Sequence, residues 1–167
     1  LCHCPSSNLK LASGIAKVPE LLAEGVQVAL GADGAPCNNT LDMFMEMRLA
    51  ALIHKPRVGP LGMDGWTVLE MATRGGARAL GLEEEIGSLE PGKRADISVL
   101  DLARPASTPG GAELASQIVY SASADCVRDV LIDGQVVLRD RELLTLDERS
   151  VLEAANRESE RIASRVG

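Results

Sequence analysis

A helix, a tight turn and a buried strand follow one another directly near the start of the chain. Residues 14–25 carry apolar side chains at helical spacing, and Gly25 is a residue typical of the position just after a helix. The next run, Val26–Gly31, is short, apolar and β-branched, which predicts a strand buried on both faces. This order of elements is typical of a parallel α/β repeat.

The residues after this strand predict a loop and two helical segments. A polar loop, Ala32–Thr40, leads into an expected helix over 41–55, for which Asn39 or Thr40 can act as the cap. Proline and glycine residues then interrupt the chain, and helical patterns resume over 64–75 and 76–82. Residues 1–85 therefore resemble the closing units of a parallel α/β structure.

The pattern changes at residue 86, where turn residues give way to strand patterning. The clearest element is a hairpin, because Asp133–Gly134 favours a two-residue type I′ turn. We expect residues 86–167 to form a small β unit that ends in a charged amphipathic helix. The expected elements are strands at 96–102, 118–120, 127–132 and 135–139, a loop at 103–113, and a helix at 147–165.

Length and composition limit the class of protein. With 167 residues the chain is too short for a complete α/β barrel of about 250 residues. Its 46% hydrophobic and 25% charged residues are the balance of a folded globular protein. The net charge of −7, with no basic patch, argues against a nucleic-acid partner, and no apolar run is long enough to span a membrane. The four cysteines are too few and too scattered for a disulfide scaffold, so we expect reduced thiols and a cytoplasmic location.

Asp33 is the main candidate for chemistry. It lies just past the carboxyl end of the predicted apolar strand, where parallel α/β folds bind their ligands. A carboxylate in this position can bind a metal ion or accept a proton from bound water. From position alone, an aspartate that merely caps the loop or the next helix explains it equally well.

Other polar residues carry weaker signals. His3 is a candidate for contact with substrate or metal, although a structural histidine is the commoner case. Ser6, Ser7 and Asn8 are candidates for binding substrate, and turn chemistry explains them equally well. Glu46 and Arg48 favour ion pairing on the next helix. The cysteine spacing fits a zinc cluster poorly, and no base accompanies Cys37 at a defined spacing as a nucleophile requires.

Longer stretches of the sequence carry a specific resemblance. The run from HCPSSN through LGADGAPCNNTLDMFMEMRLAALIHK closely resembles the amidohydrolase superfamily. Its nearest branch contains triazine chlorohydrolases and 5-methylthioadenosine/S-adenosylhomocysteine deaminases. The later runs IGSLEPGKRADISVLDL and VRDVLIDGQVVLRD resemble that branch's return from the barrel into a β-sandwich. The resemblance extends from residue 3 to about residue 165.

The resemblance implies a fold and a reaction. Family members have a (β/α)8 TIM barrel with a catalytic metal, usually zinc or iron, and a small β-sandwich. Residues 1–85 would then hold barrel strands 7 and 8 with the helices that follow, and residues 86–167 part of the β-sandwich with a terminal helix. Asp33 matches the strand-8 aspartate, which binds the metal and accepts a proton from the attacking water. His3 matches the family's strand-7 histidine position, which implies a residue that lines the site, and Ser6 and Asn8 stay candidates for substrate binding.

The resemblance also shows what the chain lacks. The family's His-x-His pair, its other histidine ligands and its catalytic glutamate have no counterpart, since the chain holds only His3 and His54. We therefore expect a C-terminal part of a longer metal-dependent hydrolase that deaminates an aminated heterocycle, such as an adenosine derivative, a purine or a triazine.

Three further expectations follow. The isolated chain should be inactive and bind zinc weakly, because one carboxylate does not hold a catalytic zinc. The full-length enzyme should be a homo-oligomer that acts on a small molecule. The alternatives are a non-catalytic assembly module and a cysteine hydrolase that uses Cys37.

Overall fold

A short parallel strand pair forms the base of the N-terminal half. The computed structural model describes residues 1–107 and 113–166. Strand β1 (Cys2–His3) pairs in parallel with β2 (Ala29–Leu30), with Cys2 opposite Ala29. The backbone N–H of Gly31 continues the ladder by donating to the carbonyl of His3 at 2.9 Å. The predicted strand over Val26–Gly31 is thus present, although regular pairing covers only Ala29 and Leu30, near its carboxyl end.

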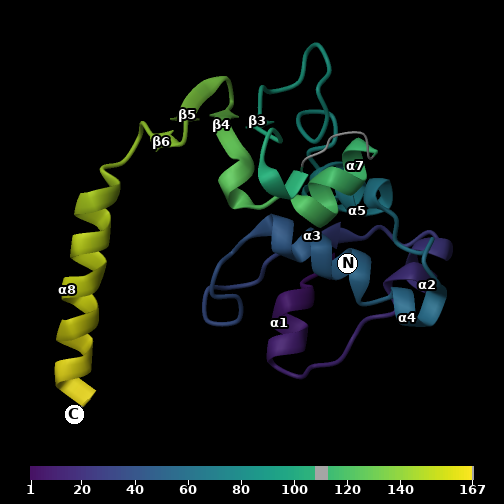
Figure 1. Cartoon of the computed structure of the whole chain (residues 1–167), viewed down its shortest axis with the longest axis horizontal. Coiled ribbons are helices and arrows are strands. Elements are labelled where there is room, and N and C mark those ends of the chain that lie inside the picture. Colours follow the sequence, from purple (N-terminus) through teal and green to yellow (C-terminus); the bar gives the residue numbers. More distant parts are fainter. Residues whose placement is uncertain (108–112, 167) are drawn as a thin grey trace.

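Six short helices accompany this strand pair (Figure 1). They are α1 (Pro5–Lys10), α2 (Val18–Ala23), α3 (Met43–Leu52), α4 (Lys55–Val58), α5 (Gly65–Ala72) and α6 (Arg74–Leu80). Gly25 has a φ of +77°, as expected for the residue that ends the α2 segment. The helices predicted at 64–75 and 76–82 are confirmed as α5 and α6.

The expected cap of α3, Asn39 or Thr40, was wrong by two or three residues. Leu41 has a φ of +51°, so the chain is still turning at this point and the helix begins later. Asp42 is the cap, and its side chain accepts a hydrogen bond from the backbone N–H of Phe44 at 2.9 Å. Asn39 and Thr40 lie in the preceding loop.

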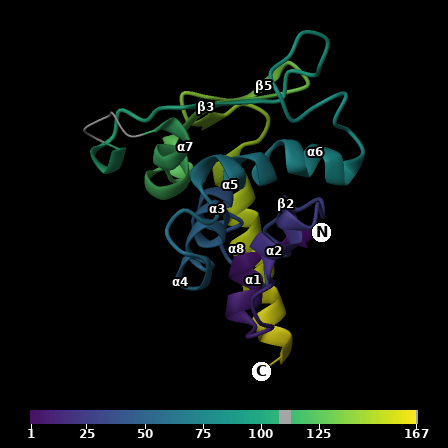
Figure 2. The same cartoon turned by 90° about the vertical axis from the view of Figure 1, so that its right-hand side faces the viewer.

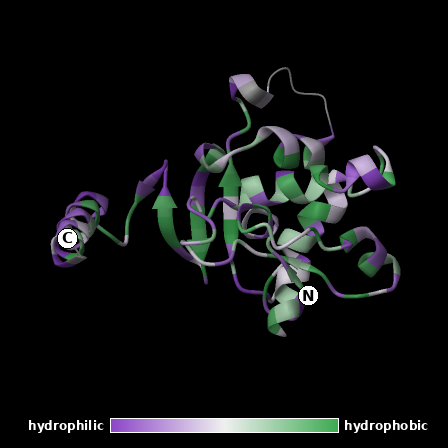
Figure 3. Cartoon of the chain, turned by 90° about the horizontal axis from the view of Figure 1, so that it is seen from below, coloured by the Kyte–Doolittle hydropathy of each residue, from purple (hydrophilic) through white to green (hydrophobic). Residues whose placement is uncertain are grey.

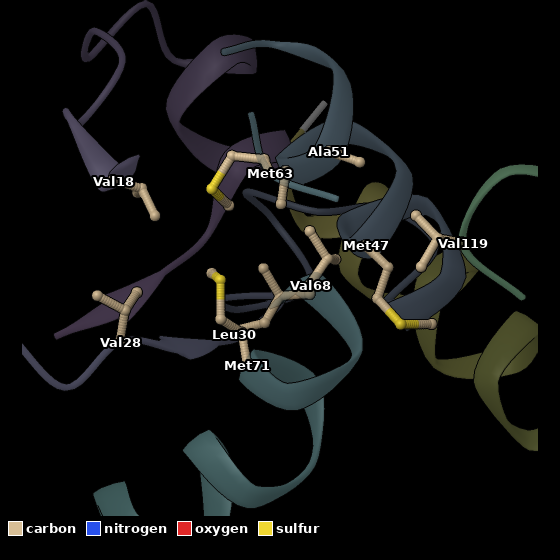
Figure 4. Packing of buried hydrophobic residues seen from close by; sticks show 10 residues of the cluster. Val18, Val28, Leu30, Met47, Ala51, Met63, Val68, Met71 and Val119 are labelled. Carbon is tan, nitrogen blue, oxygen red and sulfur yellow. The ribbon is translucent and has the colours of Figure 1, made fainter. Parts of the chain in front are cut away.

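The hydrophobic core lies between β2, α3 and α5 (Figure 4). Aliphatic and methionine side chains fill it, in agreement with the scarcity of aromatic residues. Gly75 lets α6 approach β2, because a Cβ at this position would lie 2.7 Å from the carbonyl oxygen of Val28. The buried cluster contains Val18, Val28, Leu30, Met47, Ala50, Ala51, Met63, Val68, Met71 and Val119.

A four-stranded antiparallel sheet forms the second half, in the order β3-β4-β5-β6. Figure 2 shows it on the far side of α5 and α6 from the parallel pair. The predicted hairpin is confirmed: β4 and β5 flank Asp133 and Gly134, whose φ values of +50° and +77° suit a type I′ turn. The strands are Ile97–Leu100, Val127–Ile132, Gln135–Arg139 and Glu142–Leu143.

The strand predicted at Ile118–Tyr120 was wrong. The chain forms α7 (Leu114–Ser116) and then a π-helical turn, Gln117–Ser121. Ala115, Val119 and Ala122 are all fully buried, and their spacing of four and three residues fits a helical face packed on the core. The apolar run is too short for its period to be recognised. Part of the loop predicted at 103–113 lies outside the described residues.

The terminal helix is confirmed as α8 (Glu148–Val166). Figures 1 and 3 show it standing apart from the rest of the chain, and in Figure 3 it carries both hydrophilic and hydrophobic residues. Every residue from Arg139 to Arg165 is exposed, including Val151, Leu152 and Ile162.

The architecture agrees with the expected mixed α/β class. Neither sheet closes on itself within the described residues, so no barrel is seen in this chain. The division into residues 1–85 and 86–167 stays a prediction. In the part of the chain that the structure describes, no helix combines the length and the apolar character needed to cross a membrane.

Candidate functional site

Asp33 lies at the carboxyl end of the parallel strand pair. It follows β2 by three residues, and its backbone has a φ of +61°. This left-handed conformation is uncommon outside glycine, although aspartate tolerates it better than most residues. The side chain is exposed at the strand edge where parallel α/β structures bind their ligands.

Two hydrogen bonds hold the carboxylate of Asp33. The hydroxyl of Ser7 donates to Oδ2 at 2.6 Å, and the backbone N–H of Gly34 donates to Oδ1 at 2.7 Å. The bond from Ser7, followed by those from Gly34 and the Cys37 thiol, holds the pKa of Asp33 below its usual range. The carboxylate is therefore charged at neutral pH, as a metal ligand must be.

Helix α1 places the neighbouring polar residues. Cys4 caps this helix and Pro5 occupies its first position, which suits proline because the missing N–H would have no partner there. The first turn brings the buried Ser7 to Asp33, whereas Ser6 uses its backbone N–H to bind Glu46. Asn8 follows on the same helix. Substrate contact by Ser6 and Asn8 stays a prediction.

His3 packs in the interior against a second histidine. Its ring centroid lies 5.7 Å from that of His54, and the exposed fractions of the two residues are 2% and 0%. Burial first, and the neighbouring His54 second, lower the pKa of His3 to about 4. Burial also lowers the pKa of His54. Both rings are neutral at pH 7, and contact of His3 with substrate stays a prediction.

Glu46 has a role that the sequence reasoning missed. The expectation that Glu46 takes part in ion pairing at the helix surface or between helices was wrong, because Glu46 is fully buried and binds the side chain of Asn38 and the backbone of Ser6. Arg48 instead donates to the carbonyl of Ala122 at 2.6 Å. One signal was available: Glu46 stands one helical turn before the buried Ala50, on the same face of α3.

The thiols of Cys2 and Cys4 do not form a metal-binding site with Asp33 in the described residues. The sulfurs of Cys2 and Cys4 are 3.9 Å apart. Burial, and then the neighbouring Cys2, raise the pKa of Cys4 to about 11, so its thiol is protonated at neutral pH. Among residues 1–107 and 113–166, no three His, Cys, Asp or Glu side chains are grouped so that they could hold a metal ion. A role of Asp33 as a metal ligand stays a prediction.

Comparisons with known proteins agree on one family. A model described as the amidohydrolase family matches residues 1–137. A 5-methylthioadenosine/S-adenosylhomocysteine deaminase from Syntrophomonas wolfei is 45% identical over 166 residues, which are 99% of this chain and 38% of the relative. The chain therefore spans about two-fifths of the length of this relative.

Solved structures give the same result. A zinc-bound adenosine deaminase from Xanthomonas campestris superposes with a TM-score of 0.94 at 41% identity, over 98% of this chain and 37% of the other. An atrazine chlorohydrolase from Arthrobacter aurescens TC1, complexed with zinc, has a TM-score of 0.83 at 28% identity, over 93% and 34% of the two chains.

Proposed function

Because the chain belongs to the amidohydrolase family, we propose that it supplies the Asp33 side of a metal-dependent deaminase site. The observation that carries the proposal is the exposed, charged carboxylate of Asp33, held by Ser7 and Gly34 at the carboxyl end of the parallel strands. The other metal ligands would come from the part of the relatives' length that this chain does not span.

The substrate class that we propose is an adenosine-type nucleoside. The Syntrophomonas wolfei relative and the Xanthomonas campestris structure are both named as deaminases of adenosine compounds, and both are more than 40% identical to this chain. The atrazine chlorohydrolase is a more distant match at 28%. We therefore favour hydrolytic removal of an amino group from a purine over removal of chloride from a triazine.

Asp33 would act in two ways in this reaction. As a charged ligand it would help to hold zinc or iron. Such a metal ion acts as a Lewis acid and lowers the pKa of a bound water molecule. As a base it would accept a proton from that water while the hydrogen bond from Ser7 keeps the carboxylate in place. Ser6 and Asn8 would lie around the substrate, and His3, which is 2% exposed, would have to be uncovered to join them.

The test uses a polypeptide in which these 167 residues are joined to the remaining length of the relatives. Ammonia release from adenosine, 5-methylthioadenosine and S-adenosylhomocysteine is measured with and without zinc. We expect Asp33→Asn to lower turnover by at least about 10²-fold, the scale of general acid–base catalysis. Glu160→Gln, which changes an exposed carboxylate on α8, is the matched control. Near-normal turnover by Asp33→Asn would refute the proposal.

An assembly role is the second candidate, and α8 is the observation that favours it. Its apolar residues Val151, Leu152 and Ile162 are 50%, 57% and 58% exposed, an arrangement that favours association. Size-exclusion chromatography together with a metal assay separates the two candidates. A stable oligomer that binds no zinc and shows no deaminase activity, even when joined to the remaining length of the relatives, would favour assembly.

A further inference from the structure

We infer that Glu46 is a positioning residue that holds together the two segments of the Asp33 site. One segment is the start of α1, which carries Ser7. The other is the loop 33–38, which carries Asp33. The geometric part of this inference concerns the described chain alone, and its catalytic part rests on the proposed function.

The carboxylate of Glu46 reaches both segments at once. Its Oε2 accepts a hydrogen bond from the backbone N–H of Ser6 at 3.0 Å, and its Oε1 accepts one from Nδ2 of Asn38 at 2.6 Å. Glu46 is 0% exposed and Asn38 is 4% exposed, so water does not compete for these bonds. Bonds to a charged acceptor are stronger than bonds between neutral groups, and the low dielectric of the interior strengthens them further.

Asn38 connects Glu46 to the backbone turn that follows Asp33. Its backbone N–H donates to the carbonyl of Gly34 at 2.9 Å, which closes a turn directly after Asp33. Its side-chain Oδ1 accepts from the backbone N–H of Leu41 at 2.9 Å, which fixes the side of the amide that donates to Glu46. The loop is therefore attached to α3 through a single amide of known orientation.

Ser6 connects Glu46 to Ser7, which binds Asp33. The two residues are adjacent in α1, and the Ser7 hydroxyl is 2.6 Å from Oδ2 of Asp33. The contacts thus form a closed ring that runs from Glu46 through Ser6 and Ser7 to Asp33, and back through Asn38. Opening the ring at Glu46 would remove the buried bonds that attach α1 and the Asp33 loop to α3. It would leave the two segments joined by the Ser7–Asp33 bond and by the exposed bonds from Nζ of Lys10 to Pro36 and Asn39, so their positions would be less well fixed.

The polarity of these groups provides a sharp test. In Glu46→Gln, a single carbonyl oxygen faces two donors, so either Ser6 or Asn38 loses its bond. In Asn38→Asp, a carboxylate oxygen at position 38 faces a carboxylate oxygen of Glu46 where the 2.6 Å bond was, and neither can donate. The double variant, Glu46→Gln with Asn38→Asp, restores both bonds: the amide oxygen at position 46 still accepts from the Ser6 N–H, and the amide nitrogen at position 46 donates to the carboxylate at position 38. Donor and acceptor are exchanged only in the second bond, and the net charge of the original chain is kept.

Amide hydrogen exchange, followed by NMR on this chain, measures the ring directly. In Glu46→Gln we expect exchange of the Ser6 and Asn38 amides to be at least about tenfold faster, since their protection reports local opening. The core amide of Val68 should stay within about twofold. The double variant should return the first two amides to within about threefold of the original. Glu70→Gln, on the exposed surface of α5, is the matched control and should change none of them.

Two results would overturn the geometric inference. One is unchanged protection of Ser6 and Asn38 in Glu46→Gln. The other is a double variant that restores nothing, because a general loss of stability would not be reversed by exchanging donor and acceptor.

The catalytic part is tested in the active polypeptide described above. Glu46→Gln should lower kcat by about 10- to 100-fold with KM within about threefold, since a displacement of 1 Å can cost about 10²-fold. The double variant should recover most of this loss. Unchanged kcat, or a loss that the double variant does not recover, overturns the catalytic part. Normal turnover by Asp33→Asn would instead refute the proposed function, and the exchange result on Glu46 would still stand.

Discussion

Acid should destabilise this chain through His3 before the carboxylates titrate. His3 is 2% exposed, and its pKa is lowered from 6.5 to about 4. Between these two pH values the unfolded chain binds a proton at this residue and the folded chain does not, so acid favours unfolding. His54, whose pKa is also lowered, acts in the same direction. Each pKa unit corresponds to 1.36 kcal/mol, so the loss attributable to His3 by pH 4 is about 3 kcal/mol.

The assay is urea unfolding at pH 7.0, 6.0, 5.0 and 4.5, followed by the fluorescence of Trp66 on α5. The comparison variant, His3→Gln, keeps a polar side chain of similar size and has no proton to gain. We expect the free energy of unfolding of the original chain to fall with pH, most steeply below pH 6. The slope of the variant should be shallower by up to one proton.

The carboxylates provide an internal check on this window. The pKa of Asp33 and that of Asp101 are held below the usual 3.8 by hydrogen bonds, so their stabilisation is lost only as the pH falls below about 4. Equal slopes for the original chain and His3→Gln between pH 6.5 and 5 would refute the reasoning. So would a titration by NMR that places the pKa of His3 near 6.5.

Three further predictions concern backbone packing and metal. Gly75→Ala should lower the free energy of unfolding by about 1–3 kcal/mol, because the new Cβ would overlap the carbonyl of Val28. At Gly76→Ala the new Cβ meets nothing within 4 Å, so this variant should be neutral or stabilising. Urea unfolding of both variants checks this, and equal effects would contradict it. Gly134→Ala should cost about 1 kcal/mol in the same assay, because φ is +77° there, and no loss would argue against the type I′ turn. Zinc titrated into the isolated 167-residue chain should bind more weakly than micromolar, with no deaminase turnover; calorimetry that gives tight one-to-one binding would contradict this.

Local chemistry explains which elements could be predicted from the sequence. The hairpin at Asp133–Gly134 was located correctly because its turn depends on two adjacent residues that tolerate positive φ. Terminal helix α8 was recognised from a long periodic pattern. The strand predicted at Ile118–Tyr120 was wrong because three apolar residues are too few to show a period. The helical form of this run depends on burial of Val119 against α3 and α5.

The candidate site shows the same division. The position of Asp33 followed from a single strand and the loop after it. Which of the two serines, Ser6 or Ser7, binds Asp33 could not be predicted, because it depends on how the first turn of α1 is oriented toward β2. The burial of Glu46 depends on the start of α1 and the loop 33–38 both packing against α3, and these two segments are distant in sequence from one another.

Helix α8 has a consequence for how the chain unfolds. With all of its described side chains exposed, its stability comes from its own backbone and from surface pairs such as Arg149–Glu153. Most of the stability of helices in proteins comes from packing of an apolar face, which the 19 residues of α8 lack among the described contacts. We therefore expect α8 to melt gradually and separately from the cooperative transition of the core around Val68. Heating this chain should remove helix content in two stages, the first of which leaves Asp33 and its hydrogen bonds intact.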